Sequence, residues 1–217
     1  MTEQGKRNWR WFRWVFHAVM LTGIVVLLIL NFARQSALRE QTRLETLGTV
    51  PEFALTERTG QSVSLGDLRG KVWIADFIFT RCAGPCPLMT AHMARLQETM
   101  KDARDLRLIS FSVDPEYDTP KVLSEYAQKF GADKEKWLFL TGNKSVIYDL
   151  ANQGFRVGAT ENPEDQRQPD EDAILHSTSF VLVDRKGRIR GYYNSDEAGA
   201  LQKLVEDARR LLRGQSS

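Results

Sequence analysis

The chain has 217 residues, of which 42% are hydrophobic and 27% are charged, with 30 Lys and Arg against 28 Asp and Glu. This balance is typical of globular proteins, and a net charge of +2 leaves no positive surplus for binding an extended nucleic acid. The two cysteines are too few for a disulfide scaffold or a four-cysteine zinc site. They can form one bridge or one two-sulfur site.

The amino-terminal part predicts a membrane anchor. Residues 14–33 are apolar except for His17, and a helix of about 20 such residues crosses roughly 30 Å of hydrocarbon. Basic and aromatic side chains at 1–13 favour the cytoplasmic side for this end. A cleaved signal peptide and a buried core helix are the alternatives. We expect an uncleaved anchor that holds the protein in the cell inner membrane by a single span, with the rest on the periplasmic side.

The remainder predicts a tether and one compact domain. Residues 34–50 are polar and end close to a proline, so we expect a tether there, followed by a domain at 51–217. Extended pieces at 53–55 and 63–65 predict a hairpin. Further strands are expected at 72–79, 106–113, 137–140, 179–184 and 188–193. Helices are expected at 86–100, 120–130, 144–153 and 197–212.

This order of elements predicts an α/β fold. Alternating strands and helices indicate a parallel core, and the last two strands add an antiparallel hairpin at its edge. The pattern fits a thioredoxin-like sheet with helices on both faces. Sites in such sheets form outside the carboxyl ends of the parallel strands, and residues 80–87 directly follow the first core strand. We therefore expect the chemistry at 80–87.

Both cysteines lie in this segment, at the junction between a strand and a helix. Cys82 and Cys86 are four residues apart, which in a helical turn brings their Cα atoms to about 6 Å, close enough for a disulfide or for one metal ion. The amino end of a helix favours negative charge, so we expect it to stabilise the thiolate form. Arg81 would add to this effect if its side chain points inward.

Three motifs together resemble the Sco (SenC/PrrC) family over about residues 51–212. They are C-x-x-x-C-P at 82–87, SVDPEYDTP at 112–120, and His176-Ser177-Thr178 before a strand. The resemblance implies a membrane-tethered, thioredoxin-like protein that binds copper through Cys82, Cys86 and His176. It also implies a role in assembling the dinuclear copper site of cytochrome c oxidase subunit II. Two thiolates and one imidazole suit Cu(I) better than zinc. Cu(II) is the alternative copper state.

Other functions use the same cysteines. A thiol-disulfide reductase could keep the copper-ligating cysteines of the oxidase subunit reduced, with Cys82 and Cys86 as its redox pair. A permanent structural bridge is a third alternative. Thioredoxins place a cis-proline before the edge hairpin, and its absence at 177–179 favours metal handling over general disulfide exchange. The partner that the resemblance implies is the oxidase subunit. Another copper chaperone or a thioredoxin-like reductant is a further candidate partner.

Several further side chains are candidates with an ordinary structural explanation. Met89 and Met93 could offer soft thioethers, but their helical spacing favours a place in the core. Asp114, Asp118 and Pro120 belong to the second motif, and we expect them to end a strand and begin a helix. His92 is expected to face away from the cysteines, and the acidic stretch at 161–172 to be a solvated loop.

Overall fold

The computed structural model describes residues 14, 17, 20–32, 44–161 and 174–214, and the side chains of 160–176 lie outside the described part. The chain divides into two units, Met1–Arg43 and Leu44–Ser217. In the first unit residues 20–32 are helical, and the predicted anchor's remaining positions at 15–16, 18–19 and 33 are not among the described residues. Neither are 1–13 and 34–43. Across the described residues, no helix combines the length and apolar character needed to cross a membrane.

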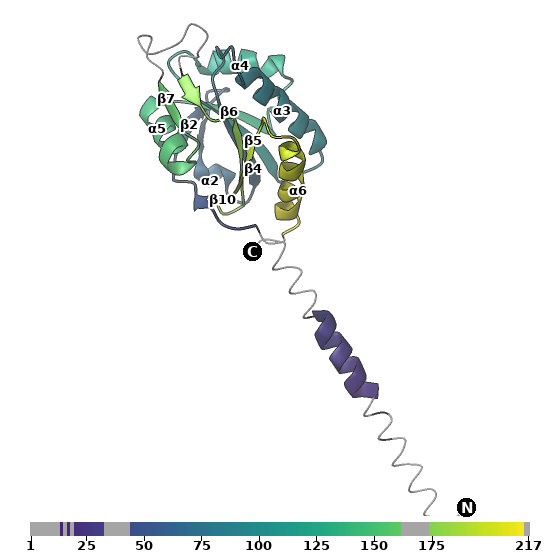
Figure 1. The fold of residues 1–217 in the computed structure, drawn as a ribbon. Coiled ribbons are helices and arrows are strands. Elements are labelled where there is room, and N and C mark those ends of the chain that lie inside the picture. The colour runs from purple at the N-terminus through teal and green to yellow at the C-terminus, as the bar shows by residue number, and fades with distance from the viewer. Residues whose placement is uncertain (1–13, 15–16, 18–19, 33–43, 162–173, 215–217) are drawn as a thin grey trace, which may run out of the picture. The chain divides into compact units, whose positions relative to one another are not determined.

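The second unit is a mixed sheet flanked by helices, which confirms the predicted α/β, thioredoxin-like class (Figure 1). Its strand order is β1-β10-β9-β4-β5-β6-β2-β3, with β7 and β8 forming a separate ribbon. The strands are β1 (Gly48–Thr49), β2 (Ala54–Glu57), β3 (Ser62–Ser64), β4 (Val72–Ile78), β5 (Leu106–Ser112), β6 (Trp137–Thr141), β7 (Ala159–Glu161), β8 (Ile174–His176), β9 (Ser179–Val183) and β10 (Arg188–Asn194). The helices are α2 (Leu65–Leu68), α3 (Cys86–Thr99), α4 (Pro120–Lys129), α5 (Lys144–Asp149), the π-helical turn η1 (Leu150–Gly154) and α6 (Ala200–Leu212).

The registers of the central strands bring three loops to one edge of the sheet. β4 and β5 are parallel and end side by side, with Ile78 opposite Ser112. β9 runs antiparallel to β4, with Val183 opposite Trp73 near the beginning of β4, so β9 begins at the edge where β4 ends. The segments that follow β4 and β5 therefore lie at the same end of the sheet as the segment that precedes β9.

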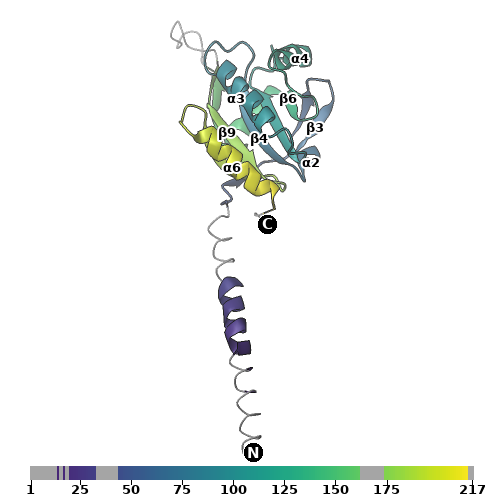
Figure 2. The same cartoon turned by 90° about the vertical axis from the view of Figure 1, so that its right-hand side faces the viewer.

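Helices cover both faces of the sheet. Figure 1 shows α3 and α6 on one side and α5 on the other, and Figure 2 shows α3 and α6 side by side across β4 and β9. On the α5 side, Phe77 stacks on Phe111 with ring centroids 5.0 Å apart, and Phe155 packs edge-on against Phe77 at 5.3 Å. Because successive strand residues point to opposite faces, Asp76 faces the α3 side. The aromatic packing makes the sheet a firm support for the loops at its edge.

The compact unit begins before residue 51. The amide of Leu47 donates to the carbonyl of Ile189, and β1 pairs with the first residues of β10. The buried Arg190 guanidinium, 2.7 Å from Asp184, also donates to the Leu44 carbonyl. Residues 44–50 fell in the predicted tether, but their backbone satisfies the otherwise open edge of β10. At the same end of the sheet, Arg185 donates to the Leu211 carbonyl in the last turn of α6.

The cap of α5 provides a first test of the fold. The Asn143 side-chain oxygen accepts hydrogen bonds from the amides of Ser145 and Val146 at 2.9 and 3.3 Å. Asn143→Ala leaves these amides to water, so we expect it to lower the free energy of unfolding by about 1 kcal/mol. Urea denaturation followed by circular dichroism measures this change. An unchanged midpoint would show that the cap is dispensable.

Candidate functional site

The two cysteines lie between the end of β4 and the first turn of α3. The Cys82 amide donates to the Phe79 carbonyl at 3.3 Å, and Cys86 is the first residue of α3. Pro85 and Pro87 occupy the start of the helix, where a missing N–H is tolerated. Both cysteines are in the reduced form, with Cys86 fully buried and Cys82 7% exposed. Two buried cysteines thus lie together at the predicted edge, with Cys82 slightly more exposed than Cys86.

The environment of Cys86 differs from the predicted one. The hydrogen bond with the Cys82 sulfur, together with burial, raises the pKa of the Cys86 thiol, and a backbone hydrogen bond at Phe79 only partly opposes this. The expected stabilisation of the thiolate by the helix end is therefore wrong for Cys86. Two sulfurs in a dry environment share one proton more readily than they carry two negative charges. A metal ion would have to displace that proton.

A polar cluster that the sequence analysis did not identify lies behind Cys86. The Thr90 hydroxyl donates to the Cys86 carbonyl at 2.8 Å and lies 2.8 Å from the Tyr126 hydroxyl. Burial raises the pKa of Tyr126, and the charges of Cys86 and Asp76 add to the rise. Asp76 is fully buried in the middle of β4. A charged residue inside an apolar strand was the available signal, because carboxylates are seldom buried without a role.

The second motif lies against the cysteine turn. Asp118 accepts hydrogen bonds from the amide and the hydroxyl of Thr80, and from the Ser112 hydroxyl at 2.6 Å. Burial raises the pKa of Asp118, and these hydrogen bonds oppose the rise. The interpretation of Asp118 as a helix-start residue was incomplete, because the adjacent Thr119 supplies the cap of α4 through the amide of Val122 at 3.4 Å. Asp118 instead connects two loops.

Arg81 takes part in the same contact between loops. Its guanidinium lies 2.6 Å from the Asp114 carboxylate and stacks over the Tyr117 ring at 4.4 Å from the ring centre. About half of the Arg81 side chain is exposed. Its charge is thus directed towards Asp114 and Tyr117, so the condition under which Arg81 would stabilise a thiolate, an inward-pointing side chain, is not met.

The third predicted ligand is described only by its backbone. His176 ends β8, where it pairs with Ala159, and its side chain lies outside the described part. Within the described side chains, no three His, Cys, Asp or Glu residues form a group that could hold a metal ion. The acidic stretch at 161–172 also falls outside, apart from the backbone of Glu161 in β7. The structure therefore brings together Cys82 and Cys86, and His176 as a ligand stays a prediction.

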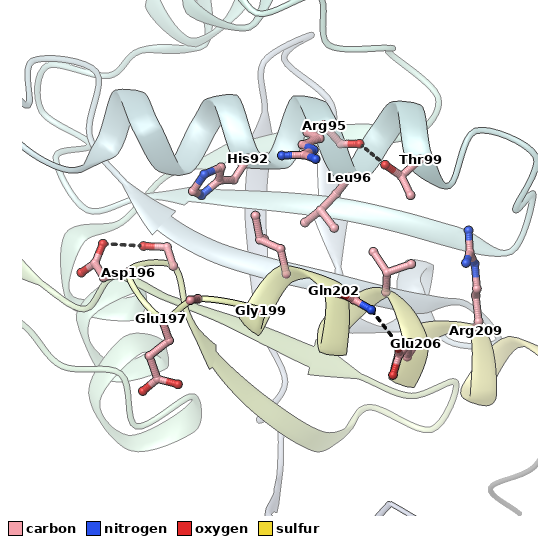
Figure 3. A pocket seen from close by; sticks show the side chains of 14 residues that line it. His92, Arg95, Leu96, Thr99, Asp196, Glu197, Gly199, Gln202, Glu206 and Arg209 are labelled. Atoms are coloured by element: carbon pink, nitrogen blue, oxygen red, sulfur yellow. Dashed lines mark hydrogen bonds between the residues drawn. The ribbon is translucent and has the colours of Figure 1, made fainter.

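The methionines and His92 have the structural places that their spacing indicated. Met89 and Met93 are fully buried in the hydrophobic core. His92 packs edge-on against Phe180, with ring centres 6.4 Å apart. It lines a pocket of about 690 Å³ between α3 and α6, together with Arg95 on α3 and Glu206 on α6 (Figure 3). Neither cysteine lines this pocket.

Comparisons with known proteins identify the family of the chain. The sequence model of the SCO1/SenC family matches residues 41–213. The chain belongs to the SCO1/SenC family. An SCO1 protein homolog of Bacillus subtilis strain 168 is 40% identical over 162 residues, which are 74% of this chain and 81% of the relative.

Two solved structures of Sco proteins extend the comparison. One comes from work on a disulfide switch in BsSco, a member of the Sco family of cytochrome c oxidase assembly proteins. It is 38% identical, with a TM-score of 0.68 over 78% of this chain and 98% of that one. The other is the copper-bound ScoI of Bradyrhizobium japonicum, 28% identical, with a TM-score of 0.62 over 76% of this chain and 99% of that one.

Proposed function

We propose that this SCO1/SenC protein is a copper metallochaperone that binds one Cu(I) through Cys82, Cys86 and His176. The observation that carries the proposal is the pair of buried, reduced cysteines joined by a sulfur–sulfur hydrogen bond at the end of β4. Thiolates are soft ligands that select Cu(I), and burial protects them from water. The copper-bound relative supports the same chemistry.

The register of β9 supports His176 as the third ligand. β9 begins at Ser179, at the edge where β4 ends, and His176 is three residues earlier in the chain. Three residues span at most about 10 Å, so the His176 backbone stays in the neighbourhood of this edge. Imidazole nitrogen completes a three-coordinate site that leaves room for an incoming ligand. Copper can then pass to a partner by stepwise exchange of ligands.

We further propose where this transfer takes place. The apolar run at 14–33 would hold the chain in the inner membrane by one span, with residues 44–217 on the periplasmic side. The recipient would be the dinuclear copper site of cytochrome c oxidase subunit II, in keeping with the relative described as an oxidase assembly protein. Copper donation would come from another copper chaperone, and a thioredoxin-like reductant would keep the two thiols reduced.

Metal stoichiometry tests this function. We expect the full chain in detergent micelles, reduced and kept free of oxygen, to bind one Cu(I) per chain. After oxidation of the two cysteines to a disulfide, Cu(I) binding should be lost, because the sulfurs no longer present thiolates. Titration against a chromophoric Cu(I) chelator measures both states. Equal uptake before and after oxidation would contradict a site built on the two sulfurs.

A thiol-disulfide reductase is the second candidate. The observation in its favour is the reduced cysteine pair at the start of α3, with Cys82 slightly exposed and Cys86 buried. Such a pair can attack a substrate disulfide with its outer sulfur and resolve the mixed disulfide with its inner one. The disulfide switch described for BsSco supports redox activity in a relative. The two functions are compatible, because copper binding requires both thiols to be reduced.

A further inference from the structure

One buried carboxylate attaches the turn that carries Cys82 to the neighbouring loop. Asp118 is fully buried and lies in the segment between β5 and α4. It accepts hydrogen bonds from the Thr80 amide at 3.1 Å and from the Thr80 hydroxyl, two residues before Cys82. The carboxylate oxygen that accepts from the Thr80 amide also accepts a hydrogen bond from the Ser112 hydroxyl. A single side chain therefore joins two segments that are 38 positions apart.

The same hydroxyl fixes the loop on the Asp118 side. Ser112 is the last residue of β5, and its oxygen also accepts a hydrogen bond from the Asp114 amide at 3.1 Å. The Asp118 amide donates to the Asp114 carbonyl at 2.8 Å. The Asp118 carboxylate thus belongs to a loop that is itself hydrogen-bonded to the end of the central strand β5. Motion of this support would require breaking several bonds together.

The two cysteines depend on this support to different degrees. Cys86 belongs to α3, whose helical backbone and buried face position it in the fold. Cys82 precedes the helix and is separated from it by Ala83, Gly84 and Pro85, in a turn outside regular secondary structure. The distance between the two sulfurs is therefore set mainly by what holds the turn. Thr80 is the residue of that turn through which Asp118 acts.

We propose that Asp118 is the positioning residue that holds Cys82 opposite Cys86, through the hydrogen bonds that it accepts from Thr80. The inference rests on the proposed function, since it concerns the same two sulfurs. A carboxylate suits this position because it can accept hydrogen bonds from several donors. It has no N–H group that would face those donors. Asparagine has the same shape but only one accepting oxygen. An Asp118→Asn variant therefore loses part of the attachment without opening a cavity.

The spacing of the sulfurs can be measured without copper. In glutathione buffers, the two thiols form the Cys82–Cys86 disulfide and give up two electrons and two protons. One oxidised glutathione accepts them and becomes two glutathione thiols. The equilibrium constant reports the effective concentration of one thiol at the other. We expect Asp118→Asn and Thr80→Val to lower it on the order of tenfold, and to weaken Cu(I) binding by a similar factor, because both loosen the turn.

Two matched variants separate positioning from general stability. Thr80→Ser keeps the hydroxyl that Asp118 accepts from, so we expect both equilibria to stay within about twofold of the wild type. Asp207→Asn removes a different buried carboxylate, on α6, which accepts from the Tyr193 hydroxyl at 2.8 Å. It should lower the free energy of unfolding and leave the thiol equilibrium unchanged. Thr80→Val keeps the test valid if Asp118→Asn fails to fold.

The outcomes separate this inference from the proposed function. If the wild type binds no Cu(I) while Asp118→Asn and Thr80→Val still lower the thiol equilibrium, Asp118 keeps its positioning role and the copper function is wrong. If both variants match the wild type in the thiol equilibrium, the positioning role is overturned whatever the copper result. It is also overturned if Asp207→Asn lowers the thiol equilibrium as much as Asp118→Asn does.

Discussion

Replacing Cys86 by serine is expected to lower the affinity for Cu(I) on the order of 1,000-fold, or about 4 kcal/mol. An alcohol stays protonated near neutral pH and is a poor ligand for a soft ion, so one of the two sulfur bonds is lost outright. Water molecules cannot replace the lost sulfur ligand, because Cys86 is fully buried. Competition with a chromophoric Cu(I) chelator under anaerobic conditions measures the loss.

Met89→Leu is the matched control for this experiment. Met89 lies one helical turn after Cys86 and is equally buried, and leucine nearly conserves its volume. If Met89 is a core residue, the affinity for Cu(I) should stay within about twofold of the wild type. A loss in Met89→Leu comparable to that in Cys86→Ser would make the thioether a ligand. Unchanged affinity in Cys86→Ser would remove the two-sulfur site.

Substitution of His176 by alanine should weaken Cu(I) binding on the order of 100-fold, or about 3 kcal/mol, while leaving the stoichiometry at one. The expected loss is smaller than that for a cysteine, because two thiolates still hold the ion and a water molecule can take the vacant position. The same chelator competition gives the affinity. X-ray absorption at the copper edge should show the imidazole scattering lost and the two sulfur ligands kept.

His92→Ala is the matched control, because it removes the same imidazole group from a position away from the cysteines. His92 packs against Phe180 and lines the pocket between α3 and α6, so its removal should leave copper affinity unchanged. The pair also separates the two candidate functions. A reductase loses activity in Cys82→Ser and Cys86→Ser but keeps it in His176→Ala. Wild-type copper affinity in His176→Ala would therefore remove the histidine from the proposed copper site.

Much of the central sheet follows from local pattern. The run at 72–79 is apolar nearly throughout, which predicts a strand buried on both faces, and β4 covers Val72–Ile78. Thr119 and Pro120 mark the start of α4, and the side chain of Thr119 does cap it. Between the strands expected at 179–184 and 188–193, a glycine favours a turn with a positive φ, and the φ of Gly187 is +76°. These signals are local, and each is decided by a few neighbouring residues.

The remaining features depend on contacts between distant segments. Gly48–Thr49 has no strand pattern of its own and becomes β1 because β10 offers an open edge. The helix expected at 144–153 changes to a π-helical turn after Asp149, where local spacing carries no clear signal. The raised pKa of the Cys86 thiol depends on where Cys82 points. Asp118 is a helix-start residue by sequence and a link between loops only in three dimensions.

The two ends of the compact unit share one end of the sheet, and this arrangement has a practical consequence. β1 pairs with Arg188 and Ile189, and the last turn of α6 is bonded to Arg185 in the adjoining turn. The cysteine turn lies at the opposite end of β4, one strand length or about 20 Å away. A solid support joined at either end of the compact unit would be attached at the end of the sheet away from the cysteine turn. A pulling force applied at Leu44 would act first on the hydrogen bonds to β10 and only then on the turn that carries Cys82.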